Sequence, residues 1–163
     1  NIEINFEGLD TYAKIYINGN YQLDTDNAFQ KYSIPVKNLL KEENELKIIF
    51  KNSIEIENNK ANNNPYQLPE GNRIYTRKAQ FQNGWDWGPK LNTTGIWKNI
   101  TLTAWNEYKI ENIFIQNNSI SDSIASLTVN IDEKYRQIDK LEYEIYVNNN
   151  KIDTLASQVS LIK

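Results

Sequence analysis

Trp85, Asp86 and Trp87 form the most specific chemical motif in the sequence. In an extended segment, successive side chains point to opposite faces, so the two indoles would share one face and the carboxylate would take the other. Gly84 and Gly88 flank the motif and can bend the chain there. Sugar C–H faces stack on aromatic rings and sugar hydroxyls bind carboxylates, so the motif suits a carbohydrate. Tryptophans packed in a β-sandwich core would give the same pattern.

Two further clusters carry charge. Arg77 and Lys78 precede the motif and could support the same site, although a solvated strand edge protected by charge is the simpler interpretation. Asp24, Asp26 and Asn27 could offer oxygen ligands to a hard cation, but such turns are usually only turns. We therefore predict no metal site and no cofactor.

The composition excludes several kinds of catalysis. The chain has no Cys and no His among 163 residues, which removes thiolate nucleophiles, imidazole bases and the common zinc sites. Its 21 acidic residues are scattered and show no distinctive pair for glycosidic cleavage, so no residue is nominated as catalytic. The net charge of -3 gives no overall attraction to nucleic acid or to an anionic membrane.

The beginning of the sequence indicates a piece of a longer protein. There is no Met, and Asn1 leads directly into an alternating strand pattern. No signal peptide and no apolar run long enough for a membrane span is visible. Because we expect the true N-terminus to lie elsewhere, the compartment stays open.

The hydrophobic pattern of the first hundred residues has mostly a period of two. It predicts strands over Ile2–Phe6 and Ala13–Ile17, with Asn18 and Gly19 forming a tight turn after the second. The denser apolar run Leu46–Phe50 predicts a more buried strand. Residues 58–71 have neither period and contain two prolines, so we expect a long surface loop.

The later part of the chain repeats the strand pattern. A strand is predicted over 99–105, and the pattern resets near Tyr108 to give three or four more short strands. No strong helical stripe is visible. We predict an all-β chain of two sandwich domains, 1–106 and 107–163, of which the second is too short for a complete immunoglobulin-like domain of roughly 100 residues.

Several blocks follow one another along the first part of the chain. The earlier blocks are Phe6-Glu7-Gly8-Leu9-Asp10-Thr11-Tyr12-Ala13, Ile15-Tyr16-Ile17-Asn18-Gly19, Thr25-Asp26-Asn27-Ala28-Phe29 and Asn44-Glu45-Leu46. The later blocks are Arg77-Lys78-Ala79-Gln80-Phe81, Gly84-Trp85-Asp86-Trp87-Gly88-Pro89 and Thr94-Gly95-Ile96-Trp97. The earlier blocks resemble the sugar-binding domain of family two glycoside hydrolases, and the later ones resemble its β-mannosidase branch in particular. The resemblance covers about residues 2–106, and the strands after it resemble the start of that family's immunoglobulin-like second domain.

The resemblance implies a role without catalysis for this chain. Such enzymes are retaining and use two carboxyl groups on a (β/α)₈ barrel that follows the second domain. No catalytic residue is therefore assigned here. The resemblance implies that Asp86 binds the terminal β-mannose of the parent's substrate, that Trp85 forms a wall, and that Arg77 and Lys78 are weaker supporting residues, while Asn27 is structural.

The same resemblance implies an incomplete jelly-roll, galactose-binding-like sandwich that lacks its first strands. An incomplete sheet exposes an unpaired edge, so we expect a dimer or a strand-swapped contact along the edge near residues 2–7. Two other functions stay open, a free-standing carbohydrate-binding module and an adhesive or scaffold sandwich without a ligand. The natural mannoside cannot be chosen from these residues.

Overall fold

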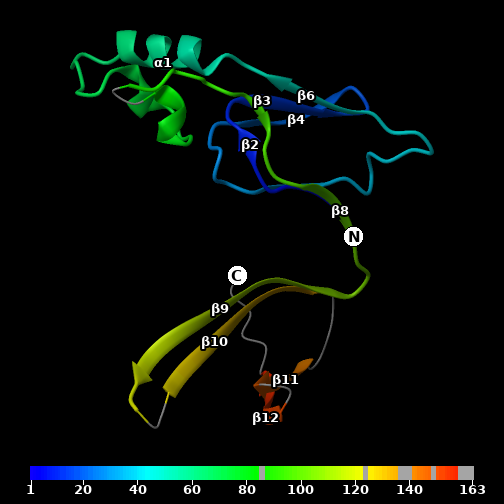
Figure 1. Ribbon diagram of the computed structural model, residues 1–163. Coiled ribbons are helices and arrows are strands. Elements are labelled where there is room, and N and C mark those ends of the chain that lie inside the picture. The colour runs from blue at the N-terminus through cyan, green and yellow to red at the C-terminus, as the bar shows by residue number, and fades with distance from the viewer. Residues whose placement is uncertain (85–86, 123–124, 136–140, 148–149, 158–163) are drawn as a thin grey trace. The chain divides into compact units, whose positions relative to one another are not determined.

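The chain folds into two compact units, residues 1–104 and 105–163, in a computed structural model (Figure 1). The structure describes residues 1–84, 87–122, 125–135, 141–147 and 150–157. Strands dominate these residues, and they contain one α-helix. The prediction of an all-β chain is therefore confirmed.

Two antiparallel three-stranded sheets form the first unit, with strand orders β5-β1-β8 and β4-β3-β6. The short strands β2 and β7 form a separate antiparallel pair. The strands are β1 (Ile2–Phe6), β2 (Leu9–Asp10), β3 (Ala13–Ile17), β4 (Asn20–Thr25), β5 (Tyr32–Pro35), β6 (Leu46–Phe50), β7 (Gly95–Ile96) and β8 (Ile100–Ala104).

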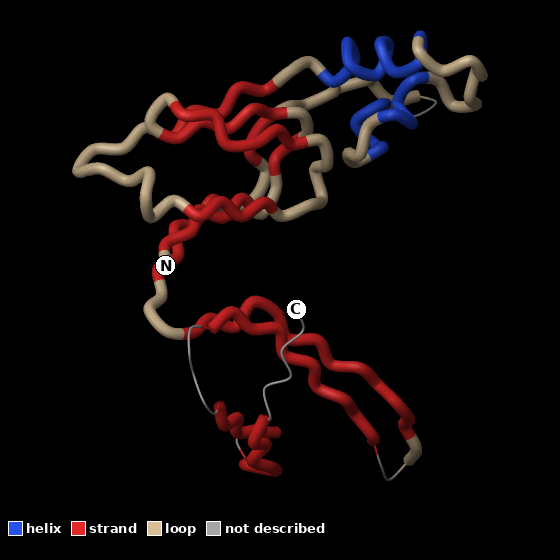
Figure 2. Tube along the Cα trace, turned by 180° about the vertical axis from the view of Figure 1, so that it is seen from behind, coloured by secondary structure: helices blue, strands red, loops and turns tan. Residues whose placement is uncertain are grey.

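The hydrophobic core is built from both three-stranded sheets. Phe6 of β1 and Ile34 of β5 are buried in one cluster with Ile15 and Ile17 of β3. The alternation of β3, buried at every second residue, is the pattern of a sheet with one face on a core. The two sheets are thus the layers of a sandwich, seen as the two red layers of the first unit in Figure 2.

The predicted hairpin turn between β3 and β4 is confirmed. Asn18 and Gly19 both have positive φ, 51° and 80°, which a tight right-twisted hairpin requires. The Asn18 amide also donates to the Leu39 carbonyl at 2.7 Å and accepts from the Glu45 N–H at 2.8 Å. This turn therefore fixes the loop before β6 as well.

Two predictions about strand position are wrong. Ile2–Phe6 is not an open edge, because β1 pairs with β5 on one side and with β8 on the other. The Glu7 N–H continues this pairing by donating to the Asn99 carbonyl at 3.0 Å. Leu46–Phe50 is a strand as predicted, but it lies at the end of its sheet and leaves Leu46 39% and Ile49 42% exposed.

An α-helix occupies part of the predicted loop. Helix α1 (Ser53–Asn62) begins at Asn52, whose side chain caps it by accepting from the Ile54 N–H at 3.0 Å. Two short 3₁₀ helices follow, η1 (Asn72–Tyr75) and η2 (Gln80–Asn83). Figure 2 shows the helices, in blue, at one end of the strand layers of the first unit. The prediction of a loop over all of 58–71 is therefore wrong. The sequence did not indicate this helix because it lacks a continuous apolar stripe.

The second unit contains two antiparallel hairpins, β9 with β10 and β11 with β12. Several apolar side chains of β9 are exposed, including Ile113, Phe114 and Ile115 at 55–58%. The strands are β9 (Tyr108–Ile120), β10 (Ala125–Tyr135), β11 (Leu141–Val147) and β12 (Asn150–Ser157). Among the described residues of both units, no helix is long and apolar enough to cross a membrane.

Candidate functional site

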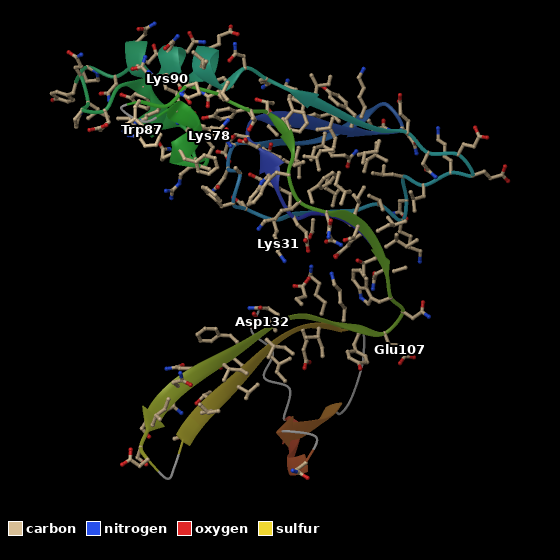
Figure 3. The ribbon with its side chains drawn as sticks, in the orientation of Figure 1. Lys31, Lys78, Trp87, Lys90, Glu107 and Asp132 are labelled. Carbon is tan, nitrogen blue, oxygen red and sulfur yellow. The ribbon has the colours of Figure 1, made fainter. Side chains whose placement is uncertain are left out.

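The aromatic motif directly follows η2 and Gly84 in the chain. This helix ends at Gly84, which has a positive φ of 90°. Trp85 and Asp86 lie outside the described residues, so their predicted roles stay predictions. Trp87 is described, and its side chain is 88% exposed (Figure 3). An indole so exposed is not a core residue, which removes the core-packing explanation for this tryptophan.

Lys78 is buried and forms an ion pair with Asp10. Its Nζ lies 3.2 Å from Asp10 Oδ1, with the side chains 0% and 8% exposed. The ammonium also donates to the Thr93 carbonyl at 2.7 Å. A buried charge is tolerated only when it is paired and hydrogen-bonded, and this one is both. The interpretation of Lys78 as a solvated strand edge is therefore wrong.

Gln82 and Thr93 complete the polar network around Asp10. The Gln82 side chain donates to Asp10 Oδ2 at 3.1 Å and accepts from the Thr93 N–H at 3.3 Å. The Gln82 carbonyl accepts from the Leu91 N–H at 3.1 Å. The network therefore ties Lys78 and Thr93, near the two ends of the 78–93 segment, to Asp10 of β2.

Arg77 differs from its neighbour because its side chain is exposed. Its backbone forms a parallel bridge with Asn27, and its carbonyl accepts from the Ala28 N–H at 2.9 Å. The side chain lines a cavity of about 560 Å³ together with Phe29 and Ile74. Of the two predicted cations, Arg77 therefore has an exposed side chain, whereas Lys78 is buried in its ion pair with Asp10.

A close contact between Gly8 and Trp97 fixes the other side of this region. A Cβ built on Gly8 would lie 2.5 Å from Trp97 Nε1, so only glycine fits there. The indole N–H donates to the Ala28 carbonyl at 2.9 Å, and Phe29 packs edge-to-face against the ring at 6.3 Å between centroids. Trp97 therefore joins the 27–29 turn to the start of β2.

Tyr12 attaches the helices to the sandwich. Its hydroxyl donates to the Tyr75 carbonyl at 3.1 Å and accepts from Lys60 Nζ at 2.9 Å. The Lys60 ammonium lies 5.0 Å from the centre of the Tyr12 ring, which adds a cation–π contact. One buried tyrosine of the strand region thus fixes both α1 and η1.

The acidic turn before Phe29 forms local structure. Asp24 is paired with Lys51 at 3.4 Å, and Asn27 Oδ1 accepts from the Phe29 N–H at 3.0 Å. The described part of the chain holds no group of three or more acidic side chains placed for a metal ion. The assignment of Asn27 as a structural residue is consistent with its hydrogen bond.

Sequence reasoning missed the residues that hold this region together. Asp10 and Lys78 are 68 positions apart and Gln82 is an ordinary polar residue, so no local pattern marks them. The only signal was that Asp10 and Lys78 both fall inside the blocks that carry the family resemblance. Glu57, Asn83 and Asn92 each have one buried polar atom without a hydrogen bond among the described residues, and they carried no sequence signal either.

Residues 1–98 match the family described as glycosyl hydrolase 2 galactose-binding domain-like. The match covers more than half of the chain and includes every strand of the sandwich except β8, together with the Asp10–Lys78 network. The chain belongs to this family of sugar-hydrolase sandwich domains.

The relatives found by comparison are β-mannosidases. Beta-mannosidase B of Thermothelomyces thermophilus is 28% identical in an alignment of 163 positions that covers 96% of this chain and 19% of that protein. Beta-mannosidase of Mus musculus is 33% identical in an alignment of 116 positions that covers 64% of this chain and 13% of that protein. The crystal structure of beta-D-mannosidase from Dictyoglomus thermophilum matches with a TM-score of 0.85 and 32% identity, over 96% of this chain and 20% of that one. The chain thus spans about a fifth or less of the relatives that it matches.

Proposed function

We propose that this chain is the non-catalytic β-sandwich part of a β-mannosidase-type retaining glycoside hydrolase, which removes terminal β-linked mannose. The observation that carries the proposal is the match to a β-mannosidase structure over 96% of this chain with a TM-score of 0.85. That match covers 20% of the other chain. The proposed partners are therefore a catalytic barrel in the same polypeptide and a terminal β-mannoside.

The composition and the fold support a role without catalysis. The sequence has no His and no Cys, and the described residues are strands with one α-helix and contain no (β/α)₈ barrel. A retaining glycosidase needs two carboxyl groups about 5 to 5.5 Å apart across the scissile bond. In the proposal, those carboxyl groups belong to the barrel, and this chain shapes the rim of the sugar pocket.

Within this proposal, Asp86 binds the sugar and Trp85 forms a wall beside it. The anchored ends of the 78–93 segment support this assignment, because the buried Lys78–Asp10 pair limits how far the segment can move. Arg77 is kept as a supporting residue since its side chain is exposed. Lys78 is now proposed to position the segment, with no contact to the substrate.

The proposal is tested in the full-length parent enzyme with Asp86→Ala. We expect kcat/KM for an aryl β-mannoside to fall roughly tenfold or more, because a charge-assisted hydrogen bond to the sugar is lost. The control is Asp122→Ala, which removes an exposed acid of the second unit and is expected to leave the rate unchanged. An unaltered rate for Asp86→Ala, with the fold intact by circular dichroism, would remove Asp86 from the substrate pocket.

A free-standing carbohydrate-binding module is the second candidate, and the exposed Trp87 side chain favours it. Such modules bind sugars on flat aromatic surfaces. A titration of this chain with a mannoside, followed by tryptophan fluorescence, separates the two functions. A free-standing module is expected to respond, whereas an enzyme fragment whose pocket lacks the barrel is expected to respond little.

For the second unit, we propose that residues 107–163 begin an immunoglobulin-like domain. The two antiparallel hairpins support this, and so do the apolar side chains exposed on β9, since a β-sandwich covers such a face with a second sheet. The expected edge-strand dimer has lost its basis, because β1 is paired on both sides.

A further inference from the structure

A polar cavity lies between the end of α1 and η1, in the helical part of the first unit (Figure 2). Its volume is about 680 Å³, and its lining residues all fall within the continuous stretch 61–75. Pockets that bind small molecules usually have volumes of roughly 300 to 1,000 Å³. The cavity is therefore large enough for a small ligand, and one short segment of the chain builds it.

Side-chain hydrogen bonds hold the wall of this cavity in place. The Asn64 side chain donates to the Tyr75 hydroxyl at 2.7 Å and accepts from the Tyr66 N–H at 3.1 Å. The Asn72 side chain donates to Asn58 Oδ1 of α1 at 2.8 Å. These bonds connect the 63–71 loop to η1, and η1 to α1. A wall held in this way costs less conformational entropy when a ligand binds.

Accessible polar groups of the lining can bond to a ligand. The exposed side chains of Asn62 and Gln67 make no hydrogen bond within the described part of the chain. The exposed Asn72 keeps its Oδ1 as an acceptor, and the Tyr75 hydroxyl, which accepts from Asn64, can still donate its own proton. The cavity thus offers both donors and acceptors. Adjacent hydroxyl groups can satisfy both, because a hydroxyl donates and accepts.

Charge and aromatic surface narrow the chemistry of the ligand further. Among the described lining residues, Glu70 is the only one that is charged at neutral pH, and its carboxylate is paired with Arg73. An anion would therefore meet no lining cation, and a cation would compete with Arg73 for the carboxylate. The Tyr66 side chain is 74% exposed, and its ring offers an apolar face to the C–H face of a sugar. A neutral ring that carries hydroxyl groups fits this lining best.

We propose that this cavity binds a neutral sugar unit whose C–H face packs on the Tyr66 ring. The amide side chains of Asn62, Gln67 and Asn72 exchange hydrogen bonds with its hydroxyl groups. The site goes beyond the proposed role at the rim of the catalytic pocket, since it uses neither Asp86 nor a residue of a barrel. Only the choice of mannose as the sugar rests on the proposed function.

The test uses the ¹⁵N-labelled 163-residue chain titrated with methyl β-D-mannopyranoside. We expect the side-chain amide signals of Gln67 and Asn72 to shift with a Kd on the order of millimolar, since one ring and a few hydrogen bonds bind weakly. Tyr66→Ala removes the ring and is expected to weaken binding roughly tenfold, whereas Tyr66→Phe keeps the ring and is expected to bind like the parent sequence. Tyr21→Ala is the matched control, because Tyr21 is an exposed tyrosine of β4 that does not line the cavity.

Gln67→Ala provides an independent variant and is expected to weaken binding roughly fivefold, because a hydrogen bond to the sugar is lost. The proposal is overturned if the sugar shifts neither amide signal, or if Tyr66→Ala binds as well as Tyr21→Ala. It is also overturned if sodium phosphate at the same concentration shifts the same signals as the sugar.

The outcome for this cavity is separate from the outcome for the proposed function. Failure of the sugar to bind here leaves the Asp86→Ala rate in the parent to decide the proposed function. Sugar binding here with an unchanged Asp86→Ala rate would remove Asp86 from the substrate pocket and retain the cavity site. No tryptophan is among the described lining residues, so binding in this cavity does not produce the tryptophan response expected of a free-standing module.

Discussion

Lys78 shows how one side chain can fix the position of a whole segment. Its ammonium meets Asp10 of β2 and the carbonyl of Thr93, which are distant from it in sequence. The surrounding side chains exclude water from both charges. Counted over all atoms of the residue, backbone included, Lys78 is 2% and Asp10 5% exposed. Removing one partner of such a pair leaves the other charge buried and unpaired, which is costly.

Lys78→Met is therefore expected to lower the free energy of unfolding by about 3 to 5 kcal/mol. Chemical denaturation followed by tryptophan fluorescence measures the change. Lys31→Met is the matched control, because Lys31 and Glu7 form a pair at 3.7 Å on the surface, with side chains 74% and 38% exposed. We expect the control to change stability by less than about 1 kcal/mol. Equal effects in the two variants would show that the buried pair does not hold the segment.

Helix α1 is stabilised more by hydrogen bonds near its two ends than by apolar packing against the sandwich. Its buried residues are Ser53 and Glu57, both polar, so it has little apolar surface to bury against the sandwich. Short helices usually gain most of their stability from packing of an apolar face. Because α1 has little such surface, capping and a few specific contacts have to contribute more of its stability. Here the contacts are the Asn52 cap and the Lys60 bonds to Tyr12 and to the Tyr75 carbonyl.

Asn52→Ala is expected to destabilise α1 by about 1 kcal/mol, because the Ile54 N–H loses its acceptor. Amide hydrogen exchange of residues 53–62 measures this directly. Asn59→Ala is the control, since Asn59 is exposed in the same helix and alanine has the higher helix propensity. Slower or unchanged exchange in Asn52→Ala would contradict the capping role.

The division into two units is the main feature of the whole molecule. All residues of the hydrophobic core cluster lie within residues 1–104, and β8, the last strand of this unit, pairs with β1, the first. A unit with its own core and its own sheet pairings is expected to fold alone.

A chain ending at residue 104 is therefore expected to unfold at nearly the same denaturant midpoint as the 163-residue chain. Equilibrium denaturation of both chains, followed by circular dichroism, measures the two midpoints. Loss of cooperative unfolding in the shorter chain would show that residues 105–163 support the sandwich. Lys78→Met made in the shorter chain separates a general loss of stability from a loss of the Lys78–Asp10 network.

The sequence by itself determined the local features of this protein. Alternating apolar residues set Ile2–Phe6 and Ala13–Ile17 as strands, Asn18 and Gly19 set the hairpin, and the missing His and Cys excluded imidazole and thiolate catalysis. These features depend on neighbouring residues only, so a linear pattern is sufficient to reveal them.

Only the tertiary structure decided which strands are central and which charges are buried. It placed β1 between β5 and β8, showed that Lys78 is in a buried pair and not at a solvated edge, and buried Glu57 of α1. The Glu57 helix was missed because α1 shows no apolar stripe, and the Lys78–Asp10 pair because its members are far apart in the chain. Strand order and charge burial arise from contacts between distant segments, and no local periodicity records them.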